Sequence, residues 1–148
     1  MRWVPTTLDH LTRVARRPEH REDDVTQYIE DTTQIREVLR QQSRAWIDEH
    51  GEPLACVGIW PMWPGVGTVW TILSEAALEH GIQLSLGVRR FLREVDESES
   101  YWRLQATIEH GNVEARSWIL WLGFVYEGTM RAYGPTGHTH DLYARVRH

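Results

Sequence analysis

The chain has 148 residues, with 21 acidic and 16 basic side chains and a formal net charge of −5. One domain with one hydrophobic core accounts for this length, and the acidic balance disfavours nucleic acid and anionic membranes as partners. The single cysteine, Cys56, excludes an internal disulfide and a cysteine-rich metal centre, and no apolar run reaches the roughly 18–20 residues of a membrane span. We therefore expect a single domain over residues 1–148 in a reducing compartment.

A short strand and a first helix are predicted at the N-terminus. Arg2–Val4 is the candidate strand, and Pro5 ends it. Thr6, followed three residues later by Asp9, is typical of the start of a helix. The predicted buried face of this helix consists of four apolar side chains at helical spacing: Leu8, Leu11, Val14 and Ala15.

A second helix is predicted after a charged stretch. Residues 19–24, which follow Pro18, are expected to form a surface loop, and Val25–Ile29 a helical turn. Thr32 or Thr33 is the expected cap of the next helix. The apolar face of that helix consists of Ile35, Val38 and Leu39.

From Ser43 the apolar spacing changes from about 3.6 to about 2 residues, which predicts strands. Arg44–Glu49 and Leu54–Trp60 are expected to pair across a turn, and Gly67–Leu73 to form a third strand. The segment between the last two strands, Trp60 to Gly65, contains two tryptophans and two prolines. It predicts a rigid aromatic loop.

Helices and strands then alternate. Ser74 is the expected cap of a short helical segment, Glu75–His80, which Gly81 separates from a strongly amphipathic helix. The buried stripe of this longer helix is predicted to consist of Leu84, Val88, Phe91, Leu92 and Val95. Tyr101–Glu109 is the next predicted strand.

The C-terminal part predicts one further helix and a hairpin. Asn112, the only asparagine, occupies the position of a helix cap, and Gly123 that of the residue after a helix end. Phe124–Tyr133 and Thr139–Val146 are the expected arms of the hairpin. The order β-α-α-β-β-β-α-β-α-β-β predicts an α+β domain with a mixed, mostly antiparallel sheet flanked by helices.

The C-terminal pattern resembles the GNAT superfamily of acyl-CoA N-acyltransferases. The resemblance is carried by Asn112, Ala115, Leu122-Gly123-Phe124 and Glu127-Gly128, which match that family's motif of a strand, an asparagine-capped helix and a second strand. The element order extends the likeness to nearly the whole chain, whereas the residue-level likeness is confined to about the last fifty residues. An unrelated α+β domain with a glycine after this helix is the alternative.

This resemblance implies a pyrophosphate loop in which backbone N–H groups and a helix N-terminus face the phosphates of acetyl-CoA. The matching stretch is His80–Ser85, where Gln83 stands in place of the loop's first glycine. We therefore expect the helix N-terminus to keep its favourable dipole for a phosphate. We do not expect the loop to form the cradle of backbone N–H groups. The candidate cofactor-binding residues are Gly81, Ile82, Gln83, Leu84, Ser85 and Asn112.

The family also uses a general acid and a base. The family's general acid is commonly a tyrosine that lies five residues before the phenylalanine of the matched motif. In this chain that position is Ile119, which cannot transfer a proton. Tyr126 and Tyr133 are the candidate replacements. The other candidate catalytic residues are Glu75, Glu109 and His110, for each of which an ordinary surface charge is the alternative. The sequence thus predicts a GNAT fold with a degenerate site.

A narrower resemblance is to the small GNAT-like proteins of tailed phages, which include the internal virion protein family of short-tailed phages. It is carried by the stretches VWTILSEAA, VRRFLREV and LGFVYEG. It implies a virion-associated or assembly protein in the host cytoplasm or the virion, which requires no cofactor. Its partners would be phage structural proteins or further copies of this chain, contacted through Trp60, Met62 and Trp63. The alternative function is an active N-acetyltransferase that moves an acetyl group from acetyl-CoA to an amine.

Two other groups of residues have metal-binding or nucleophilic chemistry. His138 and His140 lie two residues apart on one face of a predicted strand, and His110 and His148 are candidate additional ligands. Without a third ligand at a fixed spacing, no metal site is predicted. Cys56 lies within an apolar strand and is expected to belong to the core.

Overall fold

The structure is a computed structural model that describes residues 1–14 and 31–147. The predictions for Ala15, Pro18, residues 19–24, Val25–Ile29 and His148 lie outside the described residues. The chain forms two compact units. The first unit consists of Met1–Trp60 and Trp70–Glu94, and the second unit of Pro61–Val69 and Val95–His148. The single domain over residues 1–148 stays a prediction.

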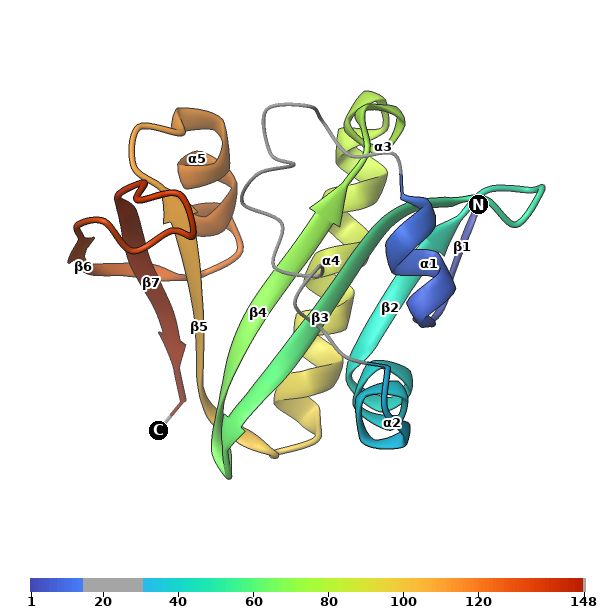
Figure 1. Cartoon of the computed structure of the whole chain (residues 1–148), viewed down its shortest axis with the longest axis horizontal. Helices are drawn as coiled ribbons and strands as arrows, with labels where there is room; N and C mark the ends of the chain where they lie inside the picture. Colours follow the sequence, from blue (N-terminus) through green and yellow to red (C-terminus); the bar gives the residue numbers. More distant parts are fainter. Residues whose placement is uncertain (15–30, 148) are drawn as a thin grey trace. The chain divides into compact units, whose positions relative to one another are not determined.

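One mixed sheet contains seven strands in the order β1-β2-β3-β4-β5-β7-β6. The β4–β5 pairing is parallel, and the pairings β1–β2, β2–β3, β5–β7 and β6–β7 are antiparallel. Helices flank the strands (Figure 1), and the predicted fold class is therefore confirmed.

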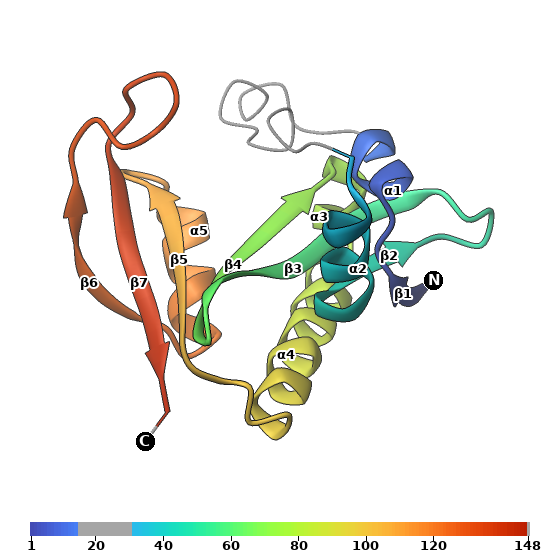
Figure 2. The same ribbon diagram turned by 60° about the horizontal axis from the view of Figure 1, so that its bottom comes forward.

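The first unit contains most of the helices. Its elements are β1 (Arg2–Pro5), α1 (Leu8–Arg13), α2 (Thr33–Gln42), β2 (Ser43–Ile47), most of β3 (Pro53–Trp63), the end of β4 (Gly65–Leu73), α3 (Glu75–Glu79) and most of α4 (Gly81–Glu97). α1 and α2 lie on one face of these strands and α4 on the other (Figures 1 and 2). The short helix α3 and the longer helix α4, which both follow β4, correspond to the two helical segments predicted after Ser74.

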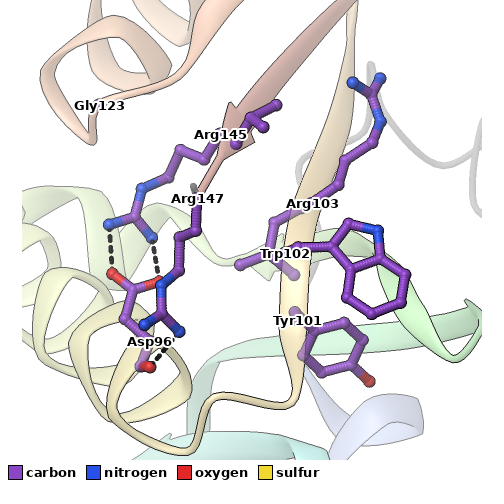
Figure 3. A pocket seen from close by; sticks show the side chains of 9 residues that line it. Asp96, Tyr101, Trp102, Arg103, Gly123, Arg145 and Arg147 are labelled. Atoms are coloured by element: carbon purple, nitrogen blue, oxygen red, sulfur yellow. Dashed lines mark hydrogen bonds and ion pairs between the residues drawn. The ribbon is translucent and has the colours of Figure 1, made fainter.

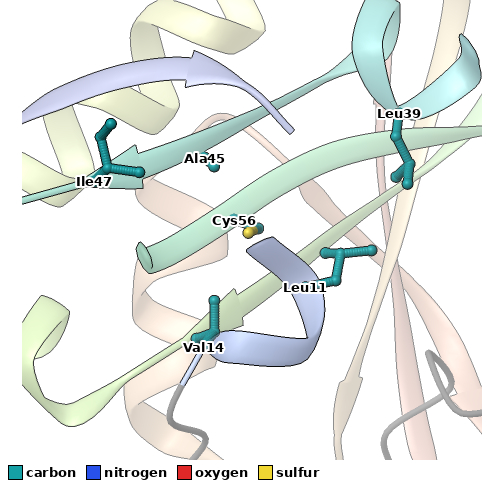
Figure 4. Close-up of a cluster of buried hydrophobic side chains, with 6 residues drawn as sticks. All are labelled: Leu11, Val14, Leu39, Ala45, Ile47 and Cys56. Atoms are coloured by element: carbon teal, nitrogen blue, oxygen red, sulfur yellow. The ribbon is translucent and has the colours of Figure 1, made fainter. Parts of the chain in front are cut away.

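The face under α1 and α2 carries a compact apolar cluster. Figure 4 shows its six buried side chains, which come from the α1 region, α2, β2 and β3: Leu11, Val14, Leu39, Ala45, Ile47 and Cys56. Trp70 packs against this cluster, with its ring over Gly58. The interpretation of Cys56 as a core residue is therefore confirmed.

The helix starts show how local hydrogen bonds set the element bounds. Thr32 caps α2 by accepting a hydrogen bond from the Ile35 N–H at 3.1 Å, as predicted. For α1 the predicted cap, Thr6, is wrong. Thr7 accepts from the His10 N–H, and His10 Nδ1 accepts from the Thr7 N–H, both at 3.1 Å. This reciprocal pair satisfies two backbone donors, while Thr6 is buried.

The predicted aromatic loop at Trp60–Gly65 is also wrong. β3 continues to Trp63, and β4 begins at Gly65 after a tight turn at Pro64. Gly65 has a φ of +86°, and a Cβ there would lie 2.3 Å from the ring of Trp102. A glycine at this position therefore allows both the turn and the close approach of the tryptophan.

The second unit holds β5 (Tyr101–Glu109), α5 (Val113–Trp121), β6 (Val125–Met130) and β7 (His140–Val146). The predicted hairpin is confirmed with shorter arms, because β6 ends at Met130, before Tyr133. Asn112 caps α5 by accepting from the Ala115 N–H at 3.1 Å, and Gly123 follows the helix with a φ of +94°. Both predicted helix boundaries are therefore confirmed.

Candidate functional site

The start of α4, in the first unit, is the segment that matches the family's pyrophosphate loop. The first intrahelical hydrogen bond runs from the Leu84 N–H to the His80 oxygen at 3.0 Å, so the N–H groups of residues 81–83 precede it. A Cβ on Gly81 would meet nothing within 4 Å, which leaves open space beside the backbone. The segment is therefore a regular helix start, and a glycine-rich loop is not formed there.

The side chains at this helix start differ in what they can contact. Ile82 and Gln83 are exposed, whereas Leu84 is buried and belongs to the core. The Ser85 hydroxyl donates a hydrogen bond to the Gly81 oxygen at 2.6 Å. The candidate cofactor contacts here are thus the backbone N–H groups of residues 81–83 and the Gln83 side chain, and Leu84 is excluded.

His80 turns toward an aromatic corner of the first unit. Its ring lies edge-on to Trp46, with centroids 6.3 Å apart, and Trp46 stacks on Trp3 at 5.6 Å. These three rings line a cavity of about 450 Å³ together with Met1 and Gln83. His80, the first residue of the stretch that matches the family's loop, therefore packs against the indole ring of Trp46.

Glu75 is an exposed residue in the first turn of α3, directly after the cap Ser74. A carboxylate at this position stabilises a helix by interacting with its dipole. No described interaction places it beside another candidate catalytic residue. Its position therefore fits a structural role.

Two candidate catalytic residues of the second unit lie at the ends of one chain of hydrogen bonds. The Tyr126 hydroxyl is 2.7 Å from Thr129 Oγ1, and Thr129 Oγ1 donates to Asp141 Oδ1 at 2.7 Å. His110 Nδ1 lies 3.0 Å and 3.1 Å from the two oxygens of the same carboxylate. The structure thus links Tyr126 to His110 through Thr129 and Asp141.

The Asp141 carboxylate is the centre of this chain. The hydrogen bond from Thr129 lowers the pKa of Asp141 below its ordinary value, and His110 and Arg116 of α5 lower this pKa further. The Asp141 side chain is 13% exposed, whereas that of His110 is 62% exposed. A partly buried carboxylate therefore binds Nδ1 of His110, and the rest of this imidazole is exposed to solvent.

The remaining candidates around the end of β5 have different environments. Glu109 lies 3.9 Å from His138 Nδ1. Ile119, which stands at the family's tyrosine position, is buried in the core under α5. His140 lies edge-on to Tyr133, and within residues 1–14 and 31–147 neither of its ring nitrogens has a hydrogen-bond partner. In this described part of the chain, no three metal-ligating side chains form a group that could hold an ion.

A second concave region of the second unit lies near the start of β5 (Figure 3). It has a volume of about 130 Å³ and includes three arginines, Arg103, Arg145 and Arg147. Arg145 donates to both carboxylate oxygens of Asp96, at 2.7 Å and 3.4 Å, and Arg147 donates to the Asp96 main-chain oxygen. Arg103 pairs with Glu127 at 2.6 Å and 3.0 Å. Carboxylates thus compensate two of the three positive charges.

Neither Thr129 nor Asp141 was predicted from the sequence as a functional residue. Their proximity follows from the register of the hairpin, in which Thr129 pairs with Asp141 across β6 and β7. A shift between Tyr126 and Gly128 sets this register. The available signal was that Thr129 and Asp141 are polar residues on the two arms of the predicted hairpin. The register shift could not be predicted from the sequence, so the pairing of these two residues could not be predicted either.

No protein-family model and no curated protein sequence matches the chain. Solved structures with a similar fold include a ribosomal-protein-alanine N-acetyltransferase from Brucella melitensis, with a TM-score of 0.75, 16% identity and 99% coverage of both chains. Ard1 from Thermoplasma volcanium has a TM-score of 0.74 at 13% identity and covers 99% of this chain and 97% of its own.

A GNAT-family acetyltransferase from Bacillus anthracis, with a TM-score of 0.66 and 13% identity, covers 97% of this chain and 93% of its own. The chain thus has the fold of GNAT-family acetyltransferases, as its sequence resemblance implied. Among the described residues, no helix has the length and apolar character to cross a membrane.

Proposed function

We propose that the protein is an N-acetyltransferase that moves an acetyl group from acetyl-CoA to an amine. The observation that supports the proposal is the fold, which matches the structure of a ribosomal-protein-alanine N-acetyltransferase over 99% of the chain. The hydrogen-bonded His110 and Asp141 add a proton acceptor of the kind that amine acylation requires. N-acetyl transfer, the alternative function predicted from the sequence, is thus favoured over a role in virion assembly.

The start of α4 would hold the pyrophosphate of acetyl-CoA. Three backbone N–H groups precede the first intrahelical bond there, and a helix of 17 residues directs its positive end toward them. The open space beside Gly81 leaves this backbone accessible. Bound acetyl-CoA would supply the thioester. Gln83 is the departure from the family's pattern, because its side chain stands where a glycine would allow the closest approach.

The protein's own groups would then handle one proton. As the acceptor nitrogen forms a bond to the acetyl carbon and the carbon–sulfur bond breaks, a base on the protein takes the proton that the nitrogen loses. The departing thiolate takes a proton from solvent, since Ile119 offers none. The candidate bases are Glu75, Glu109 and His110.

Calorimetric titration with acetyl-CoA and with free coenzyme A tests the proposal. Binding at micromolar concentration supports it, and the absence of both heat and a thermal shift at millimolar ligand overturns it. Gln83→Gly should tighten binding by restoring the family's glycine. Gln83→Ala is the matched control, because it removes the polar side chain and keeps the Cβ. If the two variants bind acetyl-CoA with equal affinity, the tighter binding of Gln83→Gly does not come from a closer approach of the backbone to the phosphates.

A second candidate function is protein binding in virion assembly, and it is supported by exposed aromatic side chains of the second unit. Trp63 and Trp102 are 59% and 58% exposed, and Met62 is also exposed. Trp60, the third predicted contact residue, is partly buried. Phage structural proteins or further copies of this chain would contact Met62 and Trp63.

Sedimentation velocity over a range of protein concentrations tests this second function for copies of the chain, and co-sedimentation with phage structural proteins tests it for the other partners. Trp63→Ala and Trp102→Ala should each shift the distribution toward the monomer or abolish the co-sedimentation. Tyr133→Ala, which removes another exposed ring of the second unit, is the control. Unchanged association in all three variants would exclude this surface.

A further inference from the structure

The outer face of α4, in the first unit, carries exposed apolar side chains. The buried face of this helix consists of four apolar residues: Leu84, Val88, Phe91 and Leu92. On its other face, the side chains of Ile82 and Leu86 are 80% and 55% exposed. Residues four positions apart are neighbours on the surface of a helix, so these two side chains form one exposed apolar patch.

Three arginines follow this apolar patch toward the C-terminal end of α4. Arg89, Arg90 and Arg93 are all exposed. Arg89 and Arg93 lie four positions apart, where two like charges destabilise a helix. Glu94, which follows Arg93 in the chain, lies 3.9 Å from Arg44 of β2. The outer face of this half of α4 is therefore positively charged.

Two glutamates lie at the opposite end of α4. They belong to α3, which ends one residue before α4 begins and lies at the N-terminal end of α4 (Figures 1 and 2). Glu75 and Glu79 are exposed and are also four positions apart, so like charges repel each other here as well. We call this part of the first unit the α3–α4 surface. It consists of Glu75, Glu79, Ile82, Leu86, Arg89 and Arg93.

The order of residues along the α3–α4 surface is symmetric, with opposite charges at its two ends. Glu79 precedes Ile82 by three positions, and Arg89 follows Leu86 by three positions. The outer glutamate and the outer arginine are each four positions farther away. A second copy in antiparallel orientation would place Ile82 of each copy against Leu86 of the other, with glutamates beside arginines. A two-fold interface requires this self-complementarity, because each residue i contacts residue j of the other copy and each j contacts i.

We propose that the protein forms a weak homodimer in which the α3–α4 surfaces of two copies pack against each other in antiparallel orientation. The inference goes beyond the proposed function and does not rest on it. A second copy is the occupant because this surface itself supplies both the acidic and the basic side chains that the contact needs. The like charges that repel each other within one copy then face opposite charges in the other.

The size of the surface sets the expected affinity. A standard protein–protein interface has about 20–30 residues on each side, and the short α3 with one face of α4 supplies far fewer. We therefore expect a dimer that dissociates in the micromolar range or above. Sedimentation velocity of the full chain, over a concentration series without acetyl-CoA, measures this dissociation constant.

Two charge-reversed variants test the pairing. E75R/E79R makes all four charged positions of the α3–α4 surface positive, and R89E/R93E makes them all negative. Each variant alone should raise the dissociation constant at least about tenfold, because like charges then face each other. E49R, which reverses an exposed glutamate elsewhere in the first unit, should leave the association unchanged. Circular dichroism checks that each variant is folded.

An equimolar mixture of the two charge-reversed variants is the decisive sample. The positive surface of one variant then faces the negative surface of the other, so the mixture should form a heterodimer although each variant alone is monomeric. Both variants keep a negative formal net charge, so attraction between the whole chains would not explain this result. A mixture that stays monomeric, with both variants folded, overturns the proposal.

The wild type and a further variant decide the remaining outcomes. A wild type that stays monomeric at millimolar concentration overturns the proposal and leaves a different protein as the occupant of this surface. Dimers that persist in both charge-reversed variants also overturn it, and they assign the association to another surface, such as that of Met62 and Trp63. If a charge-reversed variant does not fold, L86D places a charge at the centre of the contact. A folded L86D that still forms the dimer overturns the proposal.

Discussion

The aromatic corner of the first unit and the hydrogen-bond chain of the second unit each contain a histidine, His80 and His110. In the corner, His80 lies edge-on to Trp46, and Trp46 stacks on Trp3. In the chain, His110 bonds a carboxylate and exposes its other nitrogen. The same residue type thus packs against an indole ring in one place and pairs with a carboxylate in the other. The neighbours decide which role a histidine takes.

The largest expected effect tests the packing side of this comparison. Leu39→Ala removes a fully buried side chain from the cluster under α1 and α2. The loss of contacts and the remaining cavity should lower the free energy of unfolding by about 2–5 kcal/mol, measured by urea denaturation. Val38→Ala, one residue away and partly exposed, should cost clearly less. Equal costs would mean that the cluster is not the core of this unit.

Gly87→Ala tests the aromatic corner itself. A Cβ at this position would lie 2.3 Å from Nε1 of Trp3, so the stacked ring must move. We expect a loss of about 1–3 kcal/mol in the free energy of unfolding. The control is Gly81→Ala in the same helix, where nothing lies within 4 Å and alanine should stabilise by up to about 1 kcal/mol. A stabilising Gly87→Ala would contradict the described stacking.

Thr129→Val tests the hydrogen-bond chain with nearly constant side-chain volume. The lost hydrogen bond should cost about 1 kcal/mol at neutral pH. Because the folded pKa of Asp141 is lowered, its ionised form stabilises the fold at neutral pH. This contribution is lost as the pH falls below about 3.9, the ordinary value for Asp, and through the lower folded pKa. Unfolding curves between pH 2 and pH 7 should therefore depend less on pH in the variant, and an unchanged dependence would contradict the assignment.

The smallest expected effect concerns the Arg103–Glu127 pair of the second unit, which is partly exposed. The hydrogen bonds from Arg103 lower the pKa of Glu127, but water screens this interaction. A double-mutant cycle of R103Q and E127Q should give a coupling of about 0–1 kcal/mol that decreases with added salt. A larger coupling that does not respond to salt would show that the pair is shielded from solvent.

Most of the fold could be predicted from the sequence because its signals are local. Tyr101–Glu109 was predicted with the bounds that the structure has, and Asn112 and Gly123 mark the ends of α5 as expected. Trp60–Gly65 was mistaken for a loop, because proline has no backbone N–H to donate and is usually absent from the interior of a strand. Here the prolines lie at the end of β3, next to a turn that Gly65 makes possible.

The candidate site was harder to predict because it depends on contacts between distant residues. His110 and Tyr126 were found as single candidates, but Asp141 is 31 positions from His110 and joins it only through the hairpin register. His80 matched a family position, yet nothing local indicated that its ring would contact Trp46. Proximity to a partner was the missing information in both cases.

The stacked pair of Trp3 and Trp46 has a spectroscopic consequence. Their ring planes differ by only 8° at a centroid distance of 5.6 Å. At this separation the transition dipoles of two indoles couple, which can split the ultraviolet transitions into an exciton pair in circular dichroism. The signal would overlap the helical bands and distort helix content derived from them. Its disappearance in Trp3→Phe would isolate it, and the couplet would then report opening of this corner independently of helix unfolding.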